Sequence, residues 1–162
     1  MAREGAWLRE RGLEPGFFCG GGWYTDAKVA AAAAALGYVD CTPRLTRPGY
    51  LAEAASWAQL DRPARIRLES GEEGFALPTT HSIGDAARSA LTGGLLSVVH
   101  VYLHDTDLVS PRRRAMLRFA LAALARRCTV SDAAALVSAL RDGAPEVPWS
   151  SIARGGAAQP PE

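Results

Sequence analysis

The sequence predicts an α/β fold in which about five strands alternate with flanking helices. Three observations support this prediction: short apolar runs alternate with longer runs of helical spacing, Gly and Pro separate these runs, and residues 95–103 are mostly apolar and β-branched. Such alternation is typical of a mainly parallel sheet. A chain of 162 residues with 48% hydrophobic residues is long enough to bury the core of one domain.

The first half of the chain contains two glycines at expected helix ends. Gly12 follows one helical run, and Gly37 stands where a left-handed C-terminal cap is expected. An aromatic strand in residues 16–24 breaks at three consecutive glycines. The remaining expectations for this half are helices over 2–11, 26–36 and 50–59 and a strand over 38–41.

The second half begins with two runs, 65–70 and 74–80, that flank Gly-Glu-Glu-Gly and predict a hairpin or two adjacent strands. The run 95–103 predicts a strand covered on both faces. Ser82, Ser110 with Pro111, and Ser131 are expected to begin three helices, over 83–91, 111–128 and 132–140. Pro, Gly and Ala dominate afterwards, so we expect an α/β domain over 1–142 and a flexible tail over 143–162.

Composition excludes several classes of protein. The 18 basic and 17 acidic residues leave a formal charge of +1, which offers no attraction to nucleic acid or an anionic membrane. Three cysteines without a Cys-x-x-Cys pair disfavour a disulfide framework or a structural zinc site. The longest apolar run, 29–36, is too short to span a bilayer, and the charged N-terminus is not a secretory signal. The chain as written is expected to be cytoplasmic, although an export signal could lie on an upstream segment.

His100 to Leu108 holds two histidines and two aspartates in nine residues. In a strand, His100 and His104 would lie about 13 Å apart, so one metal ion could not bind both. His104 and Asp105 come where the strand ends, and ligands gather at the carboxyl ends of parallel strands. We therefore take His104 and Asp105 as candidate catalytic residues. The alternative is that His104 only marks a strand exit and that Asp107 and Ser110 are loop and capping residues.

Two other segments offer candidate binding residues. The glycine-rich turn lacks the spacing of a dinucleotide fingerprint and the lysine of a phosphate-binding loop, so Trp23 and Tyr24 are expected to line a pocket or cap the core. His81 follows two threonines at a strand end, where it would line a pocket or belong to a helix cap. The arginines 112–114 are expected on a solvated helix face.

Three segments together resemble the later part of polysaccharide deacetylases of the NodB type. They are PGFFCGGGWYTDAKVAAAAAALGYVDCTPR, LPTTHS and VVHVYLHDTDLVSPRRRAMLRFALAALARR, in that order, within residues 12–140. The resemblance implies a partial (β/α) barrel, hydrolysis of N- or O-acetyl groups on carbohydrate, and a divalent metal, usually zinc. Leu103-His104 looks like the family's final motif, whose histidine is the general acid toward the leaving amine. Asp40 falls near another motif of the family. We therefore take Asp40 as a candidate substrate-binding residue, together with Trp23, Tyr24 and His81.

The chain departs from that family in ways that affect chemistry. Cys19 and Gly21 stand where an Arg-x-Pro segment is expected, no Asp-Asp pair occurs, and the only His-x-x-x-His is the strand pair above. We therefore expect that this chain alone binds no metal and is incomplete or inactive by itself. Its expected ligand is carbohydrate, and its expected partner is a second copy of itself or a complementing chain.

Two alternatives stay open. One is a non-enzymatic α/β module that binds a glycan or small ligand around residues 19–24 and 103–107. The other is a small metallohydrolase that uses His81, His104, Asp105 and Asp107, which requires His81 to lie next to the final strand.

Overall fold

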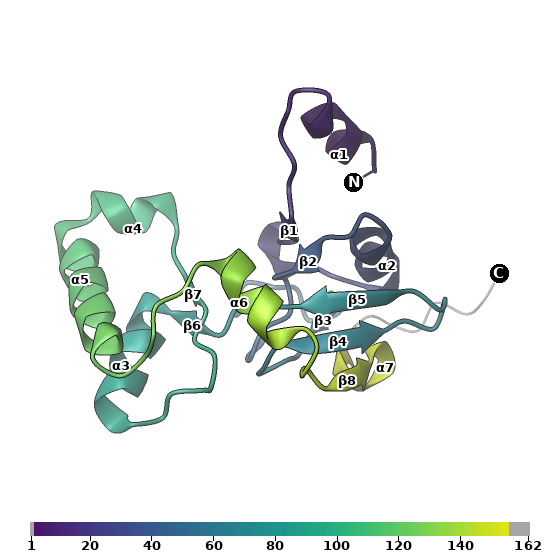
Figure 1. Ribbon diagram of the computed structural model, residues 1–162. Helices are drawn as coiled ribbons and strands as arrows, with labels where there is room; N and C mark the ends of the chain where they lie inside the picture. The colour runs from purple at the N-terminus through teal and green to yellow at the C-terminus, as the bar shows by residue number, and fades with distance from the viewer. Residues whose placement is uncertain (1, 156–162) are drawn as a thin grey trace.

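The computed structural model describes residues 2–155, which contain seven α-helices, a five-stranded sheet and two small two-stranded sheets (Figure 1). The main sheet has the order β1-β2-β5-β4-β8. Its strands are β1 (Phe17–Phe18), β2 (Val39–Asp40), β5 (Glu73–Ala76), β4 (Ala64–Arg67) and β8 (Glu146–Pro148). β1, β2 and β5 are parallel, β4 runs antiparallel to β5, and β8 is parallel to β4. The predicted α/β class is confirmed, and the sheet is open rather than a closed barrel.

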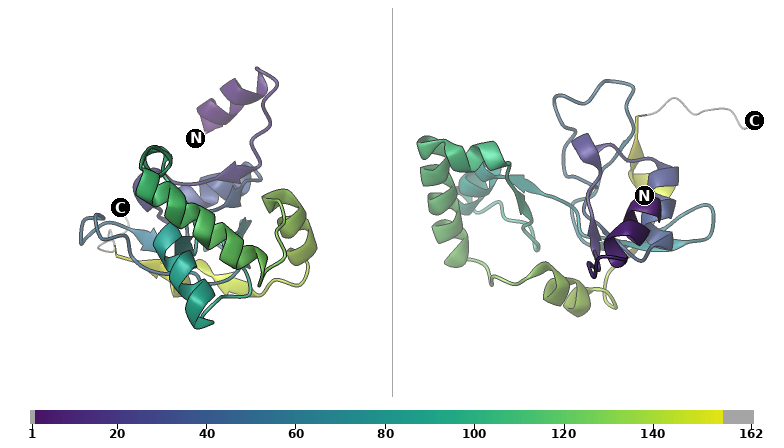
Figure 2. Two further views of the ribbon diagram at one scale, coloured as in Figure 1. Left: turned by 90° about the vertical axis from the view of Figure 1, so that its left-hand side faces the viewer. Right: turned by 90° about the horizontal axis from the view of Figure 1, so that it is seen from above.

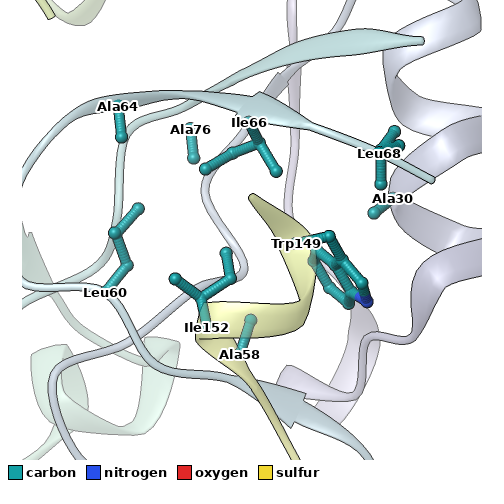
Figure 3. Close-up of a cluster of buried hydrophobic side chains, with 9 residues drawn as sticks. All are labelled: Ala30, Ala58, Leu60, Ala64, Ile66, Leu68, Ala76, Trp149 and Ile152. Carbon is teal, nitrogen blue, oxygen red and sulfur yellow. The ribbon is translucent and has the colours of Figure 1, made fainter. Parts of the chain in front are cut away.

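Helices cover both faces of this sheet because the strand side chains alternate. Ile66 and Ala76 point to one face, where they meet α2 (Ala27–Ala35) and α7 (Trp149–Ile152) (Figure 3). Phe75 points to the opposite face, toward α6 (Ala133–Leu140). We call this sheet with its covering helices, residues 17–80 and 133–154, the sheet body. Within the sheet body, β3 (Trp57–Ala58) pairs with β9 (Ala153–Arg154), and α1 (Ala2–Arg9) precedes the sheet body in the chain.

Residues 81–125 form a second unit beside the sheet body, which we call the helical lobe (Figures 1 and 2). In it β6 (His81–Ser82) is parallel to β7 (Val101–Tyr102). Its helices are α3 (Ile83–Thr92), α4 (Asp105–Val109) and α5 (Pro111–Ala125), and α3 and α5 enclose a core of their own. Across residues 2–155, no helix combines the length and apolar character needed to cross a bilayer.

Several helix ends were predicted correctly. Asp26 accepts a hydrogen bond from the Val29 amide at the start of α2, and Gly37 after that helix has a φ of 72°. Ser110 begins α5 with Pro111 at its first position. The last predicted helix is capped by Asp132 rather than Ser131. These helix ends can be predicted from the sequence because a capping side chain forms its hydrogen bond with the backbone only two or three residues away.

The predicted helix over 50–59 is wrong. Residues 50–56 form a loop, and Trp57 and Ala58 are extended in β3. The amide of Gln59 donates a hydrogen bond to the carbonyl of Ile152 at 2.8 Å. Pairing with a segment almost a hundred residues later therefore overrides the local helical spacing.

The predicted strand over 95–103 is also wrong in extent and in burial. Only Val101 and Tyr102 are in β7, and no residue of this run is fully buried. Leu95, Val99 and Val101 instead pack against the α3 and α5 core. These residues are apolar because one side of their segment is covered by the α3 and α5 core, not because they form a central strand of the sheet.

The flexible tail predicted from residue 143 is wrong for residues 146–154. β8 pairs with β4, and the side chains of Trp149 and Ile152 belong to the main core (Figure 3). The domain boundary at 142 therefore cuts through one packed unit. Residues 156–162 of the predicted tail lie outside the described residues.

Loss of the α3 cap is expected to destabilise the helical lobe. The Ser82 hydroxyl accepts a hydrogen bond from the Asp85 amide and donates one to the Asp85 carboxylate, at 3.2 and 2.6 Å. Ser82→Ala is expected to lower the free energy of unfolding by about 0.5–2 kcal/mol. Urea unfolding measures this, with Ser89→Ala inside the same helix as the matched control. Equal effects of both substitutions would contradict the capping role.

Candidate functional site

The carboxyl ends of the three parallel strands meet at one edge of the sheet body. Cys19 follows β1, Cys41 and Thr42 follow β2, and the buried Thr79 lies three residues beyond β5. The Thr79 hydroxyl donates to the Cys41 carbonyl at 2.7 Å, which ties two of these ends together. Open α/β sheets bind ligands at this edge.

Arg44 lies at this edge and is almost completely buried, with 8% of its surface exposed. Its guanidinium carbon lies 4.4 Å from the ring centroid of Trp23 and 4.6 Å from that of Tyr102. One guanidinium N–H donates to the Tyr102 hydroxyl at 2.9 Å. The two rings themselves meet edge to face at 5.2 Å. We call Trp23, Arg44 and Tyr102 the Arg44 cluster.

The glycine turn brings Trp23 to this position. The Gly20 amide donates to the Thr42 hydroxyl at 2.7 Å, so the turn is anchored to the end of β2. Trp23 has a φ of 62°, in the left-handed region that bulky residues rarely adopt. Such strain persists only where surrounding contacts enforce it, and it is concentrated at functional sites. Here the contacts are those of Arg44 and Tyr102.

A cleft of about 350 Å³ opens on the helical lobe next to the cluster. Tyr102 belongs to both, since it lines the cleft and contacts Arg44. The Tyr102 and His104 rings lie 6.1 Å apart, edge to face. The other lining residues are Ser82, Ile83, Gly84, His104, Asp107, Arg113 and Met116.

His104 is exposed at the rim of this cleft, at the start of α4. Its backbone amide donates to the Asp107 carboxylate at 2.9 Å. That hydrogen bond, followed by the one from the Arg113 guanidinium, lowers the pKa of Asp107 below its usual value. Asp105 is exposed, accepts a hydrogen bond from the Thr106 amide and is not a lining residue. Of the two candidate catalytic residues, only His104 therefore lines the cleft.

The other histidines lie in separate environments. His81 is buried, with Nδ1 at 2.8 Å from the Thr80 hydroxyl, and burial lowers its pKa despite the nearby Asp85. His100 is partly buried, with Nδ1 at 3.4 Å from the Leu77 carbonyl. Neither is among the residues that line the cleft with His104.

The divalent metal implied by the resemblance does not fit this arrangement. Within residues 2–155, no group of three or more His, Cys, Asp or Glu side chains is placed to hold a metal ion. His81, His104, Asp105 and Asp107 are accordingly not brought into one ligand set, as a small metallohydrolase would require.

Asp40 and Tyr24 are not members of the Arg44 cluster. Asp40 is buried and accepts a hydrogen bond from the Thr42 amide at 2.8 Å. Burial raises its pKa, against the effect of the hydrogen bonds from Thr42, so the carboxyl favours its neutral form more than an exposed aspartate does. The Tyr24 hydroxyl donates to Asp26 at 2.7 Å, at the start of α2. Among the candidate binding residues, Trp23 alone belongs to the Arg44 cluster.

Sequence reasoning missed Arg44, the centre of the cluster. Its signal was a single basic residue close behind a buried strand, in Asp-Cys-Thr-Pro-Arg. An arginine in a loop is ordinarily solvated, so this signal is weak. The polar residues His104 and Asp105 at a predicted strand end were the more readable sign.

Asp40→Asn is expected to stabilise the protein at neutral pH. The raised pKa of Asp40 means that the folded state binds this proton more tightly than the unfolded state. Its contribution to stability is therefore lost as pH rises through the folded pKa, whereas asparagine has no such loss. The melting temperature of the variant should exceed that of the wild type at pH 7.

Thermal unfolding between pH 3.5 and 7 checks this expectation. The gain from Asp40→Asn should disappear toward the acid end of the series. The half-exposed Asp61 provides the matched control, and Asp61→Asn should show no comparable trend. A melting temperature for Asp40→Asn equal to or below the wild-type value at pH 7 would contradict the assignment.

Comparison with protein-family models, curated proteins and solved structures found no match for the chain.

Proposed function

We propose that this chain is the sugar-binding and general-acid portion of a polysaccharide deacetylase-like protein. The observation that carries the proposal is the position of Tyr102, which lines the cleft with His104 and contacts Arg44 and Trp23. One continuous site at the carboxyl edge then contains aromatic rings, a cation and an imidazole. Such sites combine apolar surface with a few polar groups that orient a ligand.

The chemistry of His104 suits the proposed role. An imidazolium can donate a proton to a leaving amine. Its exposed position at the rim leaves it open to proton exchange with solvent. Asp107 does not compete for this role, because hydrogen bonds from His104 and Arg113 favour its charged form.

The proposal includes the partial barrel implied by the resemblance. The adjacent parallel strands β1, β2 and β5, with α2 packed on them, are compatible with part of such a barrel. The antiparallel β4 between β5 and β8 departs from a (β/α) repeat. Because the residues present do not fit the metal, the proposed activity of this chain alone is carbohydrate binding without hydrolysis.

Titration with N-acetylglucosamine oligomers, followed by NMR, tests the proposal. Tyr102→Ala should weaken binding at least tenfold, whereas His104→Gln should leave it nearly unchanged, because a proton donor is not needed for binding. Tyr38→Phe, at a buried tyrosine of the sheet body, is the matched control. Absence of binding by the wild-type chain would refute the proposal. Zinc-dependent release of acetate by this chain alone would refute the part of the proposal that says the chain binds carbohydrate without hydrolysing it.

A second candidate is a binding module unrelated to deacetylation. The observation that favours it is the lack of a metal-ligand group among residues 2–155. NMR titration of the His104 imidazole separates the two. A pKa that responds to bound sugar favours the general acid, and an unresponsive one favours the binding module.

We also propose that a second copy or a complementing chain binds along an open edge of the main sheet. The edges are β1 and β8, and Phe17 on β1 is 40% exposed. Unpaired edge strands offer free backbone donors and acceptors. Sedimentation should detect an assembly, and a strictly monomeric species would count against it.

A further inference from the structure

The guanidinium of Arg44 is a buried positive charge without a negative partner among residues 2–155. None of the ion pairs in this part of the chain involves it. Its hydrogen bond goes to the neutral Tyr102 hydroxyl, and its buried Nε atom has no partner. A buried charge is costly unless it is paired, and a buried N–H without an acceptor adds to that cost.

None of the side chains described near Arg44 forms an ion pair with it. Burial raises the pKa of Asp40, which disfavours its carboxylate form. Burial, with a smaller effect of Asp40, raises the pKa of Cys19 to about 11, so this thiol is neutral at physiological pH. Trp23 and Tyr102 stabilise the cation through their ring faces but carry no charge. The Arg44 cluster itself, Trp23, Arg44 and Tyr102, therefore contains one cation and no carboxylate.

The same contacts hold the guanidinium in a fixed orientation. Rings of Trp23 and Tyr102 lie against it, and the Tyr102 hydroxyl holds one of its nitrogens. A planar guanidinium fixed in this way suits a planar carboxylate, which it can bind through two parallel hydrogen bonds.

The ligand is expected to approach from the side of Cys19 and Tyr50, which are both exposed. The charge of Arg44 opposes the rise in pKa that burial causes at each of these groups, so both lie within its electrostatic reach. Tyr50 stands in the loop 50–56, which has no helix or strand.

We propose that Arg44 binds the carboxylate of an acidic sugar, so that the site selects acidic over neutral carbohydrate. This inference rests on the proposed carbohydrate-binding function and specifies its ligand class. A carboxylate brings one negative charge, which matches the single unpaired cation. A phosphate brings nearly two, and the nearby Arg113 is already paired with Asp107.

Parallel NMR titrations with glucuronate, glucose and inorganic phosphate test this assignment, with the indole N–H of Trp23 as the local signal. Glucuronate should shift this signal and bind at least tenfold more tightly than glucose. Arg44→Lys keeps the charge but not the two-pronged geometry, so it should weaken glucuronate binding about tenfold more than it weakens glucose binding. Arg47→Lys, at an exposed arginine of the same loop, is the control and should change neither.

Each other outcome overturns the assignment. Equal binding of glucuronate and glucose, unaffected by Arg44→Lys, would mean that Arg44 only supports the fold. Phosphate binding tighter than glucuronate would mean a general anion site. In both cases, retained binding of N-acetylglucosamine oligomers would leave the proposed function standing, whereas its loss would refute that function too. If Arg44→Lys does not fold, the wild-type protein alone provides the test. The inference is then refuted if glucuronate changes neither the Trp23 signal nor the melting temperature.

Discussion

Removal of residues 143–162 is expected to abolish the cooperative fold of the sheet body. The deletion takes away β8, which pairs with β4, and β9, which pairs with β3. It also removes the side chains of Trp149 and Ile152 from the main core. Truncating one buried tryptophan costs about 3–5 kcal/mol, and a whole domain is stable by only about 5–15 kcal/mol. The shortened chain should therefore lose its thermal unfolding transition.

Two controls separate this effect from shortening as such. A chain that ends after Gly155 keeps every contact described above and should unfold cooperatively. Trp149→Ala alone should lower the melting temperature by roughly 6–20 °C, whereas Trp7→Ala, at a half-exposed tryptophan of α1, should change it little. A cooperative transition at the wild-type temperature in the chain ending at 142 would contradict the packing of this segment.

Gly20→Ala is expected to disrupt both the glycine turn and the Arg44 cluster. A Cβ atom at Gly20 would lie 3.1 Å from the Thr42 methyl group and far too close to the Tyr24 carbonyl oxygen, which is backbone. The turn must then move, which breaks the hydrogen bond from the Gly20 amide to Thr42 and shifts Trp23 off Arg44. Overpacking of this kind costs about 1–3 kcal/mol. Sugar binding should fall at least tenfold.

The neighbouring glycine provides a matched control for this substitution. A Cβ atom at Gly21 would meet nothing within 4 Å, and its φ is not in the left-handed region. Gly21→Ala should therefore leave stability and sugar binding nearly unchanged. Calorimetric unfolding and the same NMR titration measure both quantities. Equal behaviour of the two variants would show that the close approach at Gly20 does not position Trp23.

The parts of the fold that could be predicted from the sequence depend on short-range bonds. Ser82, Ser110 and Asp26 cap helices through contacts within three residues, so their sequence context carries the information. The pairing of β3 with β9 and of β4 with β8 joins residues about 80 to 100 positions apart. The local spacing of apolar residues does not indicate such long-range pairing. For this reason the helix over 50–59 and the flexible tail were predicted wrongly.

The candidate site was predictable where strand ends bear polar or aromatic residues. His104 and Trp23 were singled out on that ground, and Tyr102 connects them through its contacts with both rings. Arg44 was not singled out, because sequence alone gives no reason to bury a loop arginine. Its burial depends on two rings that come from residues 21 and 58 positions away.

The pairing of β4 with β8 also determines when this protein can finish folding during its synthesis. Ile66 opposes Val147 across that pair, so the ribosome must add about 80 residues before the edge of β4 is covered. At about 5–20 residues per second, that interval lasts roughly 4–16 s. Throughout it, the nascent chain exposes an unpaired strand edge and the apolar face that Trp149 later covers. A chaperone that shields extended apolar segments should therefore bind the nascent chain after β4 and leave once Trp149 is made.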